Sequence, residues 1–153
     1  MNKLGIFMNF WEKNWDADHE KYIRKVADIG FDILEFQAQP LLEMSDDKLR
    51  HLKRVADECG VELTYSLGLD PRYDVSSADD SVRRGGIEYL QNIVKKIGVM
   101  DGTLLSGVSY AGWGSPNYIV DDKTALTERS KASMREIVKT AEDYGVTYCV
   151  EAV

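Results

Sequence analysis

The stretch "DADHEKYIRKVADIGFDILEF", residues 16–36, contains a helix signal followed at once by a strand signal. Asp16 or Asp18 can cap the helix, because a carboxylate accepts a hydrogen bond from the free backbone N–H groups of a first turn. Apolar residues then recur at helical spacing, and Gly30 suits the left-handed conformation in which many helices end. The apolar run "FDILEF" is typical of a buried strand. Helix, glycine and strand therefore form one unit, and the order of such units decides the fold.

The same unit recurs along the whole chain. Apolar segments predict strands over residues 4–10, 31–36, 61–69, 102–110 and 146–153, and amphipathic segments predict helices over residues 16–30, 45–60, 77–98 and 122–145. Glycines close these helices, with Gly98 as the stop of the third. Gly85 and Gly86 lie inside that helix and lower its propensity, so we expect close packing there. The order (βα)4-β predicts an α/β fold with a parallel sheet and right-handed crossovers.

Two architectures fit this order: an open doubly wound sheet and part of a (β/α)8 TIM barrel. The open nucleotide-binding folds carry GxGxxG after the first strand or GxxxxGK[ST], and this sequence has neither motif. Polar and aromatic residues instead gather where the predicted strands end, as they do at the active-site face of a barrel. They include Asn9, Phe10, Trp11, Glu35, Gln37, Ser66, Ser109, Tyr110, Trp113 and Glu151. Since a barrel has eight strands and about 250 residues, we predict that residues 1–153 form a single domain equal to half a barrel.

Composition argues against several classes of partner. The formal net charge is −7 and the basic residues are scattered, which argues against nucleic acid. No signal-peptide pattern is present, and no stretch approaches the roughly 20 apolar residues of a membrane span. Cys59 and Cys149 lack a CxxC spacing, so we expect free, buried thiols and a cytoplasmic location. His19 and His51 lie on predicted helices among charged residues, and we expect both to be exposed.

Five segments in a fixed order carry a family resemblance: "MNKLGIFMNFWEKNW", "GFDILEFQA", "SLGLDPRYDVSSADDSVRRGGIEYL", "SGVSYAGW" and "AEDYGVTYCVEAV". Together they resemble the N-terminal half of the ketose 3-epimerases, the D-tagatose 3-epimerase and D-psicose (allulose) 3-epimerase family of xylose-isomerase-like barrels. The resemblance implies a complete (β/α)8 barrel of which this chain is the N-terminal half. It also implies metal-dependent epimerisation of free ketohexoses at carbon 3 through a cis-enediolate.

The final segment, "CVEAV", contains one carboxylate, Glu151. In the family two Glu, one Asp and one His hold a divalent metal, and the match makes Glu151 the first metal ligand and the first catalytic base. The resemblance implies that this metal is Mn²⁺, with Co²⁺ or Mg²⁺ as alternatives. Carboxylate, imidazole and water ligands suit Mn²⁺ or Mg²⁺ better than soft metals. Such an ion stabilises the enediolate, so that a nearby carboxylate can take the C3 proton. Sequence alone leaves open a plain strand-end carboxylate paired with Lys or Arg. For Glu35 a supporting hydrogen bond and simple ion pairing are both open.

Further positions carry over from the resemblance as substrate-binding residues: Phe7, Trp15, Ser66, Val108 and Trp113. An aromatic face can pack against the C–H surface of a sugar, and plain core packing is the alternative for the aromatic residues. Met8 stands where the family usually has tyrosine, which leaves the preferred ketose open.

Three functions remain compatible with the sequence. The first is a ketose 3-epimerase that acts on a small-molecule ketose. The chain alone would hold one metal ligand of four, so we expect it to bind Mn²⁺ weakly and to be inactive. The second is a non-catalytic half-barrel whose two sheet edges lead it to form a homo-oligomer or to join a complementary half-barrel. The third is a related sugar isomerase, or an inosose dehydratase, of the same superfamily.

Overall fold

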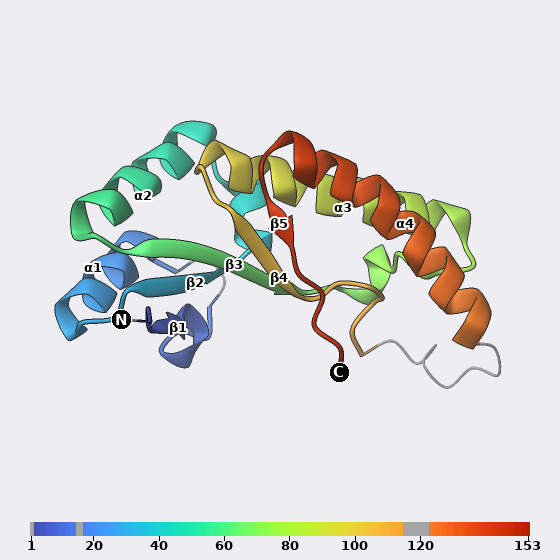
Figure 1. The fold of residues 1–153 in the computed structure, drawn as a ribbon, viewed down its shortest axis with the longest axis horizontal. Coiled ribbons are helices and arrows are strands. Elements are labelled where there is room, and N and C mark those ends of the chain that lie inside the picture. The colour runs from blue at the N-terminus through green and yellow to red at the C-terminus, as the bar shows by residue number, and fades with distance from the viewer. Residues whose placement is uncertain (1, 15–16, 115–122) are drawn as a thin grey trace.

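Helices cover one face of a curved parallel sheet in the computed structural model, which describes residues 2–14, 17–114 and 123–153 (Figure 1). The strands are β1 (Gly5–Phe7), β2 (Ile33–Gln37), β3 (Glu62–Gly68), β4 (Leu104–Val108) and β5 (Thr147–Tyr148). The helices are α1 (His19–Ile29), α2 (Asp46–Cys59), α3 (Asp80–Val99) and α4 (Lys123–Asp143), with short 3-10 helices η1 (Met8–Phe10), η2 (Gln39–Glu43) and η3 (Pro71–Tyr73). The (βα)4-β order is confirmed.

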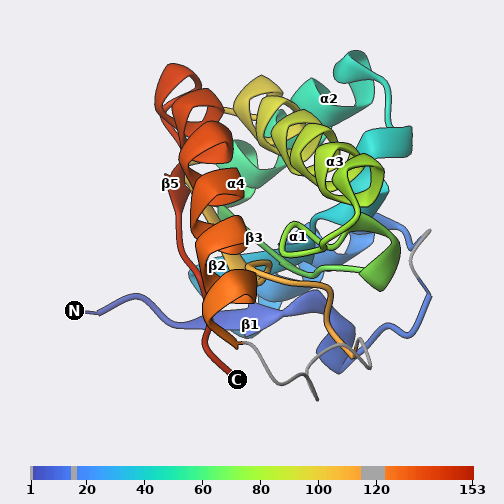
Figure 2. The ribbon, with the colours of Figure 1, turned by 90° about the vertical axis from the view of Figure 1, so that its right-hand side faces the viewer.

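The strands lie in the sheet in chain order, β1-β2-β3-β4-β5, and every neighbouring pair is parallel. A doubly wound sheet would reverse its strand order at a switch point. The unbroken order is instead that of a barrel wall, and in Figures 1 and 2 the helices α2, α3 and α4 lie together over one side of the sheet.

Local side-chain chemistry fixes the ends of the first two long helices as predicted. The carboxylate of Asp18 accepts a hydrogen bond from the backbone N–H of Lys21 (3.2 Å), whereas Asp16 lies outside the described residues. Ser45 caps α2 by accepting from the backbone N–H of Lys48, also at 3.2 Å. The glycines at positions 30 and 60 end these helices in the left-handed conformation, with φ of 85° and 69°.

Three predicted boundaries were wrong. The third helix continues through Gly98 to Val99, and the left-handed residue after it is Asp101 (φ 49°). Gly98 serves packing instead, because a Cβ there would lie 3.1 Å from Cγ of Tyr144. The first strand stops at Phe7 and is followed by η1. Regular pairing in the fifth strand covers only two residues, although ladder-like hydrogen bonds continue beyond them.

The apolar core lies between the sheet and the helices. Leu34, Phe36 and Tyr65 are fully buried, and the rings of Phe36 and Tyr65 meet edge to face with centroids 6.2 Å apart. The hydroxyl of Tyr65 reaches Sδ of Met100, which follows α3, at 3.5 Å. The expected close packing is confirmed for Gly86 of α3, where an added Cβ would collide with Tyr73. It is wrong for Gly85, where an added Cβ would have no atom within 4 Å.

The expected exposure of His19 was wrong, whereas that of His51 is confirmed. His19 is 1% exposed, and its ring meets Phe36 edge to face at 4.8 Å. Its Nδ1 lies 2.7 Å from the carbonyl oxygen of Ala17. Burial lowers the pKa of His19, because the charged ring would lose its hydration. His51 stays on the surface, where its Nε2 lies 2.8 Å from a carboxylate oxygen of Glu20.

Both cysteines in the described chain are free, as expected, but Cys149 is exposed and Cys59 is half-buried. The prediction of a buried Cys149 was wrong because the strand that precedes it forms an edge of the sheet. In the part of the chain that the structure describes, no helix combines the length and the apolarity that a membrane span needs.

Candidate functional site

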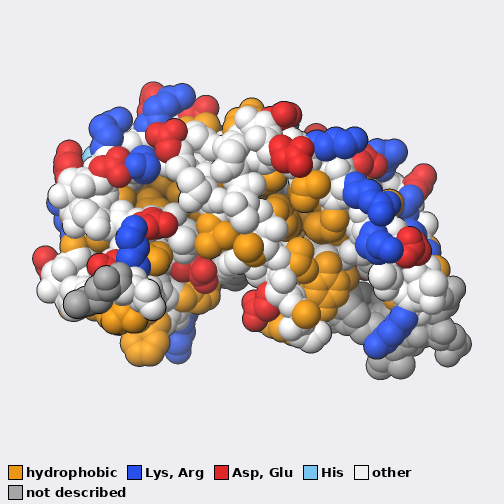
Figure 3. Space-filling view, in the orientation of Figure 1, with side chains coloured by type: hydrophobic (Ala, Val, Ile, Leu, Met, Phe, Trp, Pro, Cys, Tyr) orange, Lys and Arg blue, Asp and Glu red, His pale blue; other side chains and the backbone are white. Residues whose placement is uncertain are grey.

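The face of the sheet opposite the core is defined by strand alternation, since successive side chains point to opposite sides. Leu34, Phe36 and Tyr65 point to the helices, so Glu35 and Ser66 point to the other side, which we call the uncovered face. The register aligns Phe7 with Glu35, which places Phe7 on the same face. Figure 3 shows this side hollowed, with hydrophobic side chains gathered in and around the hollow.

Glu35 and Ser66 form a polar pair on the uncovered face. Oγ of Ser66 donates a hydrogen bond to Oε1 of Glu35 (2.9 Å), and both side chains are half-buried. This contact favours the hydrogen-bonding alternative for Glu35 over ion pairing. Ser66 is in turn aligned with Gln37 on one side and Ser106 on the other, so the uncovered face has a polar band across β2, β3 and β4.

Glu151 lies just beyond the regular part of β5, and its backbone is still hydrogen-bonded to β4. Thr147 N–H donates to the carbonyl oxygen of Thr103, and the next two bonds of the same kind run from Cys149 to Leu105 (2.8 Å) and from Glu151 to Gly107 (3.0 Å). Thr147 is aligned with Leu104, so the continued pattern, four residues further on each strand, aligns Glu151 with Val108. Glu151 is exposed at the carboxyl end of the sheet.

Trp113 lies over the uncovered face at the end of β3. Its backbone N–H donates to the carbonyl oxygen of Leu69 (2.6 Å), and its six-membered ring lies against Gly68. Gly68 is aligned with Val108, so Gly68, Val108 and Glu151 form one row across three strands. Adjacent strands are about 4.8 Å apart, which puts the two ends of this row about 10 Å apart. The indole is 60% exposed.

The structure thus brings most of the expected site residues to one face. Phe7, Ser66, Val108 and Glu151 share the uncovered face, and Trp113 lies over it. Trp15 lies outside the described residues.

Sequence reasoning missed Gly68 and Gln39 at this site. Nε2 of Gln39 donates to the carbonyl oxygen of Gly68 at 3.0 Å, and Nε2 of Gln37 donates to Oε1 of Gln39 at 2.8 Å. A glycine inside a strand is a usable signal of close approach.

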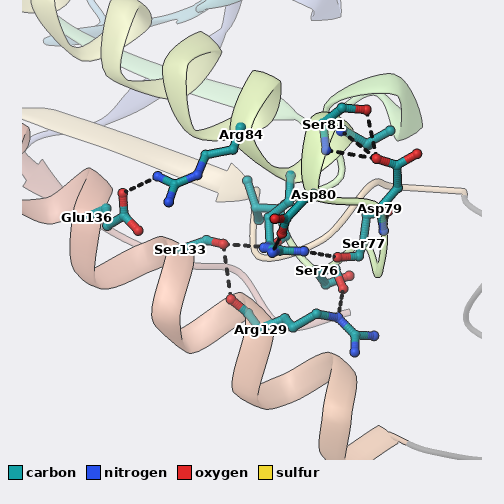
Figure 4. Close-up of polar contacts among 12 residues, drawn as sticks. Ser76, Ser77, Asp79, Asp80, Ser81, Arg84, Arg129, Ser133 and Glu136 are labelled. Carbon is teal, nitrogen blue, oxygen red and sulfur yellow. Dashed lines mark hydrogen bonds and ion pairs between the residues drawn. The ribbon is translucent and has the colours of Figure 1, made fainter.

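Side-chain bonds to the backbone tie segment 74–79 to α4 beside this face (Figure 4). Oγ of Ser133 donates to the carbonyl oxygen of Val75 (2.8 Å), and Nε of Arg129 donates to that of Ser76 (2.7 Å). An ion pair also joins α3 to α4. These contacts fix one wall of a side pocket of about 670 Å³ that Trp113, Tyr110 and Val153 also line. Glu151 and Ser66 do not line this side pocket, so it borders the uncovered face.

Glu151 is chemically suited to be one donor to a divalent metal. Its carboxylate oxygens are hard ligands, which Mn²⁺ and Mg²⁺ prefer, and the side chain is exposed. Among residues 2–14, 17–114 and 123–153 no group of three His, Cys, Asp or Glu side chains is placed to hold an ion. These residues therefore fit a metal through one donor.

The fold and the row of residues at the carboxyl ends of the strands define the class of protein. Residues 23–153 match the model of the xylose isomerase-like TIM barrel, and this chain belongs to that family. The five strands correspond to the N-terminal half of such a barrel.

The relatives are sugar 3-epimerases by name. The chain is 37% identical over 151 residues to the D-psicose 3-epimerase of Ruminiclostridium cellulolyticum, covering 99% of this chain and 52% of that protein. It is 30% identical to the L-ribulose 3-epimerase of Mesorhizobium japonicum, covering 100% of this chain and 50% of that one. The crystal structure of D-psicose 3-epimerase with D-tagatose from Clostridium cellulolyticum H10 superposes with a TM-score of 0.94 at 37% identity, over 99% of this chain and 53% of the other. The chain spans about half the length of the curated relatives it matches.

Proposed function

We propose that this chain is the N-terminal half of a metal-dependent ketose 3-epimerase that inverts carbon 3 of free ketohexoses of the D-tagatose and D-psicose type. One observation carries the proposal: Glu151 lies at the carboxyl end of the sheet on the same face as Ser66, Val108 and Trp113. The family membership and the 3-epimerase relatives support the reaction class.

Glu151 is the group that takes the proton from carbon 3. Its exposed carboxylate can approach a ketose lying on the uncovered face, as a general base must. The C–H electron pair then moves toward C2 and the carbonyl oxygen becomes negative, giving a cis-enediolate. A bound Mn²⁺, or Co²⁺ or Mg²⁺ in its place, would stabilise that negative charge as a Lewis acid. A second acid is needed to return a proton to the opposite face of carbon 3. When it does so, the epimer forms.

The remaining residues of the uncovered face bind and orient the sugar. The exposed Trp113 offers apolar surface to its C–H groups, and Phe7, Val108 and Trp15 are proposed for the same role. Ser66, fixed by Glu35, offers a hydroxyl oxygen to the sugar. The substrate is therefore a small ketose, and Met8 leaves the choice among ketoses open.

The activity can be tested by reconstitution. The chain is co-expressed with the C-terminal half of the D-psicose 3-epimerase of Ruminiclostridium cellulolyticum, and conversion of D-fructose to D-psicose is followed by chromatography with Mn²⁺ present. We expect turnover by the pair and none by either half alone. Glu151→Gln should reduce turnover by about 10²–10⁴, the usual contribution of a general base. Glu142→Gln, on the exposed surface of α4, is the matched control. A soluble, assembled pair without turnover, or a fully active Glu151→Gln pair, would refute the proposal.

A second candidate function is non-catalytic association. β1 and β5 each have one strand neighbour among the described residues, and apolar Leu4, Val150 and Val153 are exposed near these edges. The chain would then form a homo-oligomer or join a complementary half-barrel. Sedimentation analysis tests this directly, since a compact monomer at all concentrations argues against self-association.

Three further expectations stay predictions. A related sugar isomerase is the alternative within the same family, and substrate profiling of the reconstituted pair decides it. The cytoplasmic location depends on the two free cysteines. The lack of nucleic-acid partners depends on the net charge of −7.

A further inference from the structure

The backbone conformation at Gly68 does not require a glycine, so the need for one comes from its surroundings. Its φ is not in the left-handed region, so an L-residue could adopt its conformation. A Cβ at this position would point to the uncovered face and lie 2.9 Å from Cζ3 and 3.3 Å from Cδ2 of Trp113, and closer still to Cε3. The three atoms nearest to such a Cβ all belong to the indole, so a side chain at Gly68 would collide with Trp113.

The indole and the strand beneath it are held from both sides. The backbone N–H of Trp113 donates to Leu69, and the N–H of Leu69 donates to Val108 at 2.8 Å, so the backbone that bears the indole is tied to β3 and, through it, to β4. On the other side Gln39 donates to the carbonyl oxygen of Gly68. Because the strand that bears Gly68 is fixed, an added methyl group there has to displace the ring away from the strand.

We propose that Gly68 is a positioning residue that sets the height of the Trp113 indole above β3 and thereby the space for the ketose. This inference rests on the proposed function. The indole is at one end of the row Gly68–Val108–Glu151, about 10 Å long. Its exposed ring face is available to the C–H surface of a sugar whose carbon 3 lies toward Glu151. A ring displaced away from β3 narrows that space and weakens ketose binding, while the proton transfer at Glu151 is left unchanged.

The test compares Gly68→Ala with Gly85→Ala, a helix glycine at which an added Cβ meets nothing within 4 Å. The first readout is the indole N–H resonance of Trp113 in the ¹⁵N spectrum of the chain, assigned among its three tryptophans with Trp113→Phe. We expect this resonance to shift in Gly68→Ala and to stay in place in Gly85→Ala. The second readout is the reconstituted pair, in which Gly68→Ala should raise KM for D-fructose roughly fivefold, the loss of one aromatic contact, with kcat nearly unchanged.

An unmoved Trp113 resonance, or a moved resonance with wild-type KM, would overturn the inference. If the wild-type pair shows no epimerisation, the proposed function fails, and D-fructose titrated against the Trp113 resonance decides the inference separately. A response that weakens in Gly68→Ala supports it, and no response in the wild-type chain overturns it.

The double variant Gly68→Ala/Trp113→Phe covers the case in which Gly68→Ala does not fold. A smaller ring should accept the methyl group and restore the thermal midpoint. If the double variant is no more stable than Gly68→Ala, the clash is not with the indole and the inference is wrong.

Discussion

The adjacent glycines of α3, Gly85 and Gly86, should respond in opposite directions to the same substitution. At Gly85 a new Cβ has no atom within 4 Å. Replacing a helix glycine by alanine reduces the freedom of the unfolded chain and favours the helix by about 0.5–1 kcal/mol. Gly85→Ala should therefore stabilise the protein by that amount.

At Gly86 the same methyl group meets backbone. Its Cβ would lie 2.8 Å from the carbonyl carbon of Tyr73 and 3.0 Å from Cγ1 of Val75, and closer still to the Tyr73 oxygen. This segment cannot move aside easily, because Ser133 of α4 donates to the carbonyl oxygen of Val75. Overpacking costs about 1–3 kcal/mol, and contact with backbone puts it at the upper end. After the gain of about 1 kcal/mol in helix propensity, Gly86→Ala should destabilise the protein by about 2 kcal/mol.

Urea and thermal unfolding followed by circular dichroism measure both variants. For a chain of this size 1 kcal/mol moves the midpoint by about 2–4 °C. We expect Gly85→Ala to melt a few degrees above the wild type, and Gly86→Ala to melt about 4–8 °C below it. The reasoning is wrong if both variants shift in the same direction, or if Gly86→Ala is as stable as the wild type.

Two further predictions concern titratable side chains. Burial lowers the pKa of His19 below 6.5, so below about pH 6.5 the unfolded chain takes up a proton that the folded chain resists, and stability falls by up to about 1.4 kcal/mol per pH unit. The urea midpoints measured at about pH 7.0 and about pH 5.5 should therefore move closer together in His19→Gln. They should stay apart in the surface control His51→Gln. An unchanged pH dependence of stability in His19→Gln would contradict the prediction. Cys149 is exposed and Cys59 is half-buried, so thiol labelling should have a fast phase from Cys149. Cys149→Ser should remove this fast phase, and Cys59→Ser should keep it. Loss of the fast phase in Cys59→Ser instead would contradict the prediction.

Features set by a few neighbouring residues could be predicted from the sequence. Asp18 and Ser45 cap their helices as expected, because the donor and acceptor lie within three residues of each other. Gly30 and Gly60 end those helices for an equally local reason. Gly98 failed as a stop because its role is set by Tyr144, a residue of another element. His19 failed likewise, since its burial depends on Phe36 across the helix–sheet interface.

The same distinction between local and long-range features applies to the residues of the site. A carboxylate at the end of an apolar strand, Glu151, is visible in the sequence and the family resemblance gives it a role. The contact between Gly68 and Trp113 is not visible, because two residues far apart in the chain meet only when residues 109–114, which follow β4, return over β3. The hydrogen bond from Ser66 to Glu35 depends on the register of β2 with β3, which the sequence pattern does not specify to one residue.

The position of the Glu151 carboxylate depends on a second glycine of the sheet. Glu151 lies past the regular part of β5, and the bond from its N–H to the carbonyl oxygen of Gly107 keeps it beside β4. Gly107 has a φ of 109°, and a Cβ there would lie 2.8 Å from the backbone nitrogen of Leu67 and 3.0 Å from its carbonyl carbon. Both the conformation and the space exclude other residues. Because Gly107 has no side chain, β4 can approach β3 closely, and the carbonyl oxygen of Gly107 accepts the hydrogen bond from Glu151. In the same way, the missing side chain at Gly68 makes room for the indole at the other end of the row.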